Sequence, residues 1–154
     1  MKITCGYGDA GVLILPWNDF AVPLYGVQSG SGQDICDREN SAVYKKRYRG
    51  GHCDIICDHA SQGFDVIKQC GYTSPAVVQT PKSARIYRWE AAMLGRNHNG
   101  LYACNGARLD KIRWADLIMY TCNDAAGKDI TIVFFTLQQE FKHEIYKVEQ
   151  PWNI

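Results

Sequence analysis

Short apolar runs separated by turn residues dominate the chain. The runs are enriched in β-branched and aromatic side chains, which favours strands over helices. Gly, Ser and Asn residues, which are typical of turns, lie between them. The pattern predicts a mostly β protein, a closed barrel of about eight strands with one or two short helices. The eight candidate strands are residues 11–15, 20–25, 53–57, 76–80, 85–93, 101–104, 116–122 and 129–137.

Two segments have helical patterns. Residues 33–48 contain good helix formers, with Ser31 as a candidate cap and a basic run, 45–49, near the end, where cations suit the helix dipole. We interpret that basic run as a solvated helix end. Residues 61–70 place Phe64 and Ile67 three apart, enough for one or two turns lying on a sheet.

Residues 141–154 mix charged residues with aromatic and aliphatic ones, and we expect a tail that packs loosely or serves as a handle for a partner. No shift in composition marks a second domain, so residues 1–154 are predicted to form one domain that ends in this tail.

Charge and hydropathy narrow the choice of partners. The chain has 154 residues, with 17 basic and 16 acidic side chains and a net charge of +1. This balance gives no overall electrostatic footprint for nucleic acid, and we expect no nucleic-acid partner. The sequence contains no apolar run of ~20 residues and no signal-peptide pattern at its start. As it stands it predicts no membrane span and a cytoplasmic location, or an extracellular one if the chain is a fragment, and it indicates no oligomeric state.

The cysteine count is odd. Seven cysteines are spread along a chain whose length does not require disulfides, so we expect mostly reduced thiols. An odd number leaves at least one thiol without an internal partner, and that thiol is a candidate reagent. The seven are Cys5, Cys36, Cys53, Cys57, Cys70, Cys104 and Cys122.

Cys122 ends an apolar strand and is followed at once by the turn residues Asn123 and Asp124. A rigid strand that opens to a loop suits a nucleophile, because a thiolate needs a firm base, access to substrate and a neighbouring group that favours its charge. The alternative is a buried structural cysteine at a strand end, which is common in proteins.

A second predicted strand ends in polar residues, at His59. If residues 53–59 are extended, Cys53, Cys57 and His59 share one face of the strand. Two cysteines four apart on a strand are roughly 13 Å apart, too far to bind one zinc ion, so we expect no metal and no cofactor. His59 is either an acid/base catalyst or a polar residue entering a loop.

Taken together, a histidine at one strand end and a cysteine at a later one resemble the sortase family over most of the chain. The similar segments are residues 11–16, 20–25, 55–59 with the following 62–67, and 117–122. The resemblance implies an eight-stranded sortase barrel and a peptide or protein substrate. It also implies that Cys122 attacks a backbone carbonyl to form a thioacyl intermediate. His59 would protonate the leaving amine and then assist an incoming amine or water.

The sequence departs from the sortase pattern in two places. Sortases carry an arginine on the eighth strand, and residues 129–137 contain none. Lys128 and Arg38 are other cations, and Arg38, Asp58 and Asn123 are the first candidates for supporting roles. The membrane anchor of a sortase is also missing. Two functions therefore stay open: a cysteine transpeptidase or peptidase, and a catalytically inactive sortase-like module that binds a peptide or has a structural role.

Overall fold

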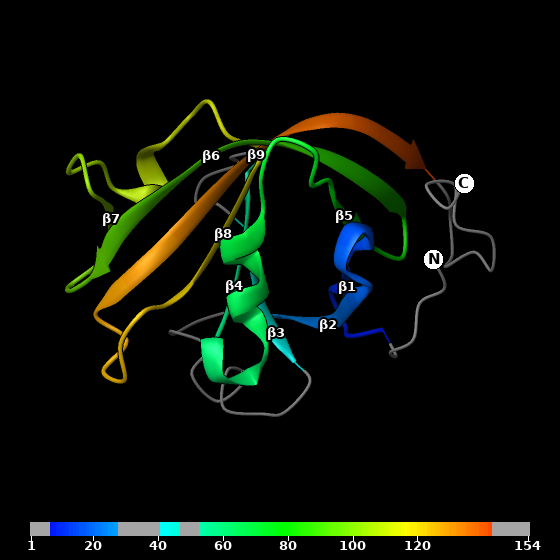
Figure 1. The fold of residues 1–154 in the computed structure, drawn as a ribbon. Coiled ribbons are helices and arrows are strands. Elements are labelled where there is room, and N and C mark those ends of the chain that lie inside the picture. Colours follow the sequence, from blue (N-terminus) through cyan, green and yellow to red (C-terminus); the bar gives the residue numbers. More distant parts are fainter. Residues whose placement is uncertain (1–6, 28–40, 47–52, 143–154) are drawn as a thin grey trace.

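The structure is a computed structural model that describes residues 7–27, 41–46 and 53–142. Nine strands and four short 3-10 helices follow one another in these ranges (Figure 1). The strands are β1 (Gly11–Leu15), β2 (Phe20–Gly26), β3 (Ala42–Lys46), β4 (Asp54–Asp58), β5 (Ala76–Gln79), β6 (Ser83–Asn97), β7 (Leu101–Ala103), β8 (Leu117–Cys122) and β9 (Asp129–Lys142). The helices are η1 (Pro16–Asn18), η2 (Ala60–Gln62), η3 (Phe64–Gln69) and η4 (Leu109–Lys111).

Eight of the strands close into a barrel. The sheet order is β5-β1-β2-β3-β4-β8-β9-β6-β7, and an additional pairing of β5 with β6 completes the ring. β7 lies outside this ring, as a short arm hydrogen-bonded to the far end of β6 (Figure 1). The predicted closed eight-stranded barrel is confirmed, but β7 was counted as a member and β3 was not.

β3 corrects the helix that the sequence predicted over residues 33–48. Residues Ala42–Lys46 form a strand that pairs parallel with β2 and antiparallel with β4. Its side chains alternate, with Tyr44 in the barrel core and Val43 in the outer core. Burial on both faces and pairing on both edges outweigh the helix propensity of the local sequence. Ser31 and residues 33–40, 47 and 48 of the predicted helix lie outside the described residues.

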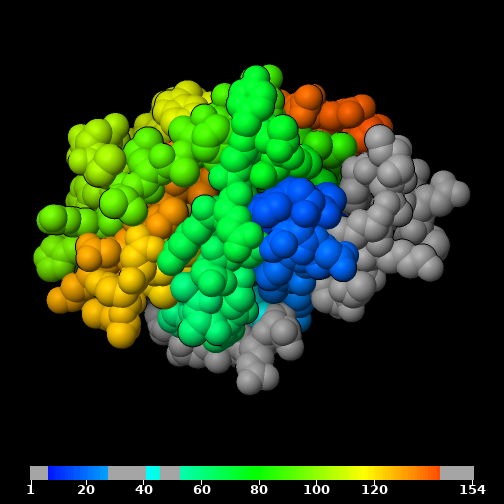
Figure 2. Space-filling view, in the orientation of Figure 1, coloured from blue at the N-terminus to red at the C-terminus, as the bar shows by residue number. Residues whose placement is uncertain are grey.

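The predicted short helix over residues 61–70 is present as two 3-10 helices, η2 and η3. Gly63 separates them because its backbone is left-handed, with φ of 96°. Phe64 and Ile67 are buried, as their spacing predicted. In the space-filling view, the green segment with η2 and η3 lies between the blue N-terminal residues and the yellow and orange region of β8 and β9 (Figure 2).

The two faces of the central strands belong to two different apolar cores. Along β8, Leu117 and Met119 pack inside the barrel, while Ile118 and Tyr120 face the outside. The outer core lies against the connection between β7 and β8, which contributes Leu109 among others. Cys122 has the parity of Tyr120, so the alternation of a strand directs it to the outer face.

Two further sequence expectations have partial outcomes. Of the predicted tail, residues 141 and 142 continue β9, and residues 143–154 lie outside the described ranges. No helix in the described part of the chain is long and apolar enough to cross a membrane.

Candidate active site

The parallel pairing of β4 with β8 brings two distant parts of the chain to one edge of the sheet. Asp58 at the end of β4 is in register with Thr121, one residue before the end of β8. The Thr121 hydroxyl donates a hydrogen bond of 2.9 Å to the carbonyl oxygen of Asp58. Since both strands run in the same direction, His59 and Cys122 follow at the same edge. The sequence singled out these two residues, and the fold places them side by side.

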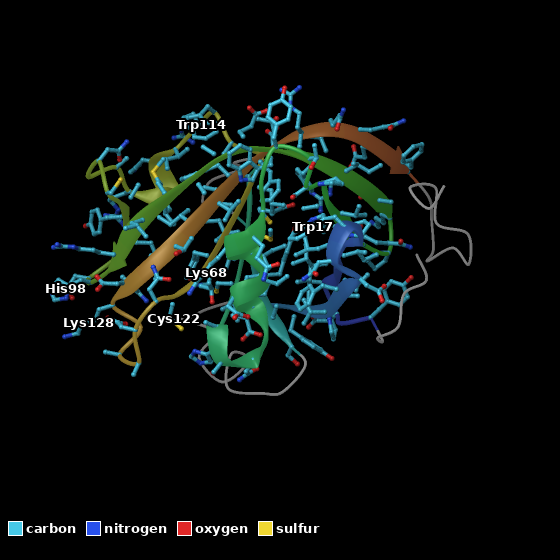
Figure 3. All side chains as sticks on the ribbon, in the orientation of Figure 1. Trp17, Lys68, His98, Trp114, Cys122 and Lys128 are labelled. Atoms are coloured by element: carbon cyan, nitrogen blue, oxygen red, sulfur yellow. The ribbon has the colours of Figure 1, made fainter. Side chains whose placement is uncertain are left out.

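Cys122 is half-buried and held from two sides. Its Sγ accepts a hydrogen bond from the backbone N–H of Ala60, at 3.5 Å. Its carbonyl oxygen accepts a hydrogen bond of 3.2 Å from Nζ of Lys68 on η3. Figure 3 shows Lys68 and Cys122 next to each other at this end of β8. A backbone donor therefore contacts the sulfur of Cys122, and a side-chain ammonium group contacts its carbonyl oxygen.

A groove of about 330 Å³ lies in front of Cys122. The ends of β4 and β8 border it, the β6–β7 turn and the β8–β9 loop form its sides, and β3 reaches it from the far side. This volume is within the range of ligand-binding clefts. The lining residues are Lys45, Cys57, Asp58, His59, Asn97, Leu101, Tyr120, Thr121, Cys122, Ala125, Ala126, Gly127 and Ile130.

Asp58 has an unusual carboxyl group. The residue is 6% exposed, and its Oδ1 accepts a hydrogen bond of 2.8 Å from the backbone N–H of His59. Burial raises the pKa of Asp58 to about 7, although the bond from His59 and the charge of that residue oppose the shift. The carboxyl group is therefore partly protonated at neutral pH, beside the histidine.

The other sequence candidates lie less centrally. Asn123 is exposed and accepts a hydrogen bond of 2.9 Å from the Thr131 hydroxyl, so its amide helps to hold the β8–β9 connection. Lys128 lies out on that connection (Figure 3), where its backbone N–H donates to Asp124 Oδ1 at 2.8 Å. Arg38 lies outside the described residues. The residue of β9 that pairs with Cys122 is Ile130, which is 2% exposed.

The described cysteines are in the thiol form and lie in different surroundings. Cys57 is buried in the groove, Cys104 is exposed, and burial raises the pKa of Cys70 to about 12. Within residues 7–27, 41–46 and 53–142, no group of three or more His, Cys, Asp or Glu side chains could hold a metal ion.

Comparison with solved structures defines the fold. Sortase E1 from Streptomyces coelicolor, with a tripeptide in its active site, is 16% identical with a TM-score of 0.63 over 88% of this chain and 91% of its own. Sortase A of Listeria monocytogenes is 9% identical, also at 0.63, over 87% of this chain and 90% of its own. The chain has the sortase fold. Sortase C from Clostridium perfringens with the C-terminal cell wall sorting motif is 12% identical, with a TM-score of 0.61 over 84% of this chain and 70% of its own.

The likeness to sortases lies in the fold and not in the sequence. No family model and no curated protein matches the chain. At these identities the sortase fold is established and the catalytic roles of Cys122 and His59 stay predictions.

Three features of this sortase-fold site were missed in the sequence. The N–H of Ala60 is a backbone group, and no side-chain pattern signals it. Lys68 reaches Cys122 through a contact between residues 54 apart in the sequence. Lys45 was visible in the basic run, but the wrong helix prediction placed it on a solvated helix end, whereas the strand β3 carries it into the groove.

Proposed function

We propose that this chain is a cysteine transpeptidase or peptidase that cleaves a peptide through a thioacyl intermediate at Cys122, with His59 as acid/base. The observation that carries the proposal is the meeting of Cys122 with the His59–Ala60 segment at one end of a groove. Two similar solved structures support a peptide as substrate. One has a tripeptide in its active site, and the other contains a cell wall sorting motif.

In the first half of the reaction, the Cys122 thiolate attacks a peptide carbonyl carbon, and the C=O electron pair moves onto oxygen. When the tetrahedral intermediate collapses, the C–N bond breaks and the imidazolium of His59 gives its proton to the leaving amine. In the second half, neutral His59 takes a proton from an incoming amine or water that attacks the thioester. The C–S bond then breaks, and the thiolate is regenerated.

The developing oxyanion would be stabilised without an arginine from β9, because the residue of β9 that pairs with Cys122 is Ile130. Backbone N–H groups can take this role, since they stabilise the oxyanion in other acyl-transfer sites. The N–H of Ala60 is already directed at the sulfur. Arg38 stays a sequence candidate for the same task.

Alkylation by iodoacetamide tests the proposed pair. We expect the Cys122 thiol at pH 7 to react about tenfold faster than an exposed model thiol, and the His59→Ala substitution to remove most of that gain, because the histidine favours the thiolate. The rate is followed by intact mass and assigned to Cys122 by peptide mapping. The Cys104→Ala variant serves as the control, since it removes an exposed thiol while leaving Cys122 in place.

Equal rates in the wild type and in His59→Ala, both at the level of a model thiol, would contradict the proposal. They would favour the second candidate, an inactive peptide-binding module, for which the apolar Ile130 opposite Cys122 is the supporting observation. A peptide library then follows cleavage and transfer products, with Cys122→Ala as the inactive reference.

A further inference from the structure

A lysine lies inside the groove at the end away from the thiol. Lys45 on β3 is half-buried, and its Nζ donates a hydrogen bond of 3.2 Å to the hydroxyl of Tyr120. The same ammonium group lies 5.9 Å from the centroid of the Tyr120 ring. Tyr120 is 8% exposed, so the cation lies against a buried ring.

The charge of Lys45 is not balanced by the part of the protein that the structure describes. The ion pairs found there join Arg85 with Asp54, Arg88 with Glu90 and Arg108 with Asp110, and none includes Lys45. Asp58 and His59 are the other ionisable side chains, apart from Cys57, Tyr120 and Cys122, among the residues that line the groove. Both belong to its thiol end. A half-buried ammonium group without a counter-ion favours an anionic ligand, because a carboxylate would compensate its lost hydration.

The strand register gives the separation between the Cα atoms of Lys45 and Cys122. Lys45 pairs with Ile55 on β4, and Ile55 pairs with Ile118 on β8. Cys122 lies four residues beyond Ile118, which is about 13 Å along the strand and about 10 Å across the sheet. The lysine and the acidic side chain together bridge part of this distance. An extended peptide advances about 3.3 Å per residue, so the remaining span is that of three or four residues.

We infer that Lys45 anchors a subsite for a substrate carboxylate, so that the preferred peptide has an Asp or Glu side chain three or four residues from the bond that Cys122 attacks. Tyr120 is the positioning residue that aims the ammonium group into the groove. The inference rests on the proposed function for the place of the attacked bond, while binding of the carboxylate does not require turnover.

Peptides with an electrophile test this subsite without any catalytic cycle. One set carries a chloromethyl ketone after an acetyl-capped peptide, and the other carries a chloroacetyl group before a peptide amide, so the two sets cover both directions from the thiol. Asp is placed at each of six positions in turn, and Asn at the same position is the neutral match. The second-order rate of Cys122 labelling is measured by intact mass.

We expect the ratio of Asp to Asn rates to reach about fivefold at the third or fourth position of one set and to stay near one elsewhere. Lys45→Met should reduce that peak to about one, and Lys45→Glu should reverse it, so that peptides with Lys at that position react faster. Lys82→Met is the matched control, because it removes the same charge from an exposed turn away from the groove. Circular dichroism confirms that each variant is folded.

A flat ratio in the wild type, or a peak that persists in Lys45→Met, overturns the subsite. Failure of the proposed function has a different signature: Cys122 then reacts no faster than a model thiol and unaffected by His59→Ala, while the Lys45-dependent Asp preference is still present. A fast, His59-dependent thiol with no Asp preference leaves the proposed function intact and removes the subsite alone.

Discussion

Two buried aspartates on β4 differ sharply in how their charge is compensated. Asp54 at the start of the strand and Asp58 at its end are 2% and 6% exposed and point to the same side of the strand. Asp54 accepts hydrogen bonds from Arg85 at 2.6 Å, Tyr44 at 2.8 Å and Tyr87 at 3.3 Å. The side-chain hydrogen bond that the structure shows for Asp58 comes from a backbone N–H.

The two ends of β4 therefore differ in character: Asp54 belongs to a hydrogen-bonded cluster inside the barrel, and Asp58 lies beside the groove. Burial and then the charge of Asp54 raise the pKa of Tyr44 to about 12, so this tyrosine stays a protonated donor to the carboxylate. At the other end, burial raises the pKa of Asp58 to about 7. The end that borders the groove therefore keeps a group that changes charge near neutral pH, which is common at functional sites.

The largest effect on stability is expected when the ion pair between Arg85 and Asp54 is removed. Asp54→Ala should lower the free energy of unfolding by about 3 kcal/mol, because it leaves the guanidinium of Arg85, whose side chain is only 16% exposed, without its carboxylate. Denaturant unfolding followed by circular dichroism measures the change. Asp65→Ala is the matched control on an exposed aspartate and should cost well under 1 kcal/mol. An equal loss in both variants would show that the Arg85–Asp54 pair is not what stabilises this end.

An intermediate effect, dependent on pH, is expected at Asp58. The folded-state pKa is about 7, above the ordinary value of 3.8, so the folded chain binds the proton more tightly than the unfolded chain. Stability therefore falls as pH rises through the window from about 4 to 7. Asp58→Asn should remove this fall, making the variant more stable relative to wild type at pH 8 than at pH 4 by about 1–2 kcal/mol, after allowance for solvent screening.

Denaturant unfolding of both proteins at the two pH values checks this prediction. The comparison of differences cancels the other titrating groups, which both proteins share. Parallel pH profiles for wild type and Asp58→Asn would mean that the Asp58 carboxyl group is as well solvated as an ordinary surface group, and the contrast with Asp54 would disappear.

The smallest effect is expected from Lys68, which contacts the site from the exposed side. Lys68→Met removes the hydrogen bond to the Cys122 carbonyl oxygen and a nearby positive charge. Iodoacetamide labelling of Cys122 should slow by about two- to threefold, since an exposed charge is strongly screened by water and salt. Lys82→Met should leave the rate unchanged, and the thermal midpoint of both variants should match wild type. A slowing of tenfold or more would make Lys68 a principal part of the site.

The contrast along β4 also shows which features of the fold could be predicted from the sequence and which could not. The apolar runs located β1, β2, β4 and β8 almost to the residue, because each alternates or is buried on both faces. β3 was missed because its local sequence favours a helix, and the reason for the strand lies in its neighbours β2 and β4. The partners of Asp54 were equally invisible, since Arg85 is 31 residues away and its contact depends on barrel closure.

The candidate site was easier to anticipate than its surroundings. His59 follows an apolar strand and Cys122 ends one, and this local signal can be seen in a single sequence. The resemblance to a known fold implied that the two residues act together, but their adjacency depends on the parallel register of β4 and β8, which no pattern in the sequence indicates. Contributions from backbone groups and from side chains on other elements, such as Ala60 and Lys45, require the three-dimensional arrangement.

The parallel pairing of β4 with β8 also determines when the surroundings of Cys122 come into existence. Thr121 and Asp58, which join the two strand ends, are 63 residues apart in the sequence. Contacts of such long range form slowly, because the entropy of closing the intervening loop must first be overcome. Until the strands meet, the thiol lacks both the Ala60 donor and the histidine beside it. Newly made chains therefore carry an ordinary cysteine, and its special chemical environment is a property of the completed barrel.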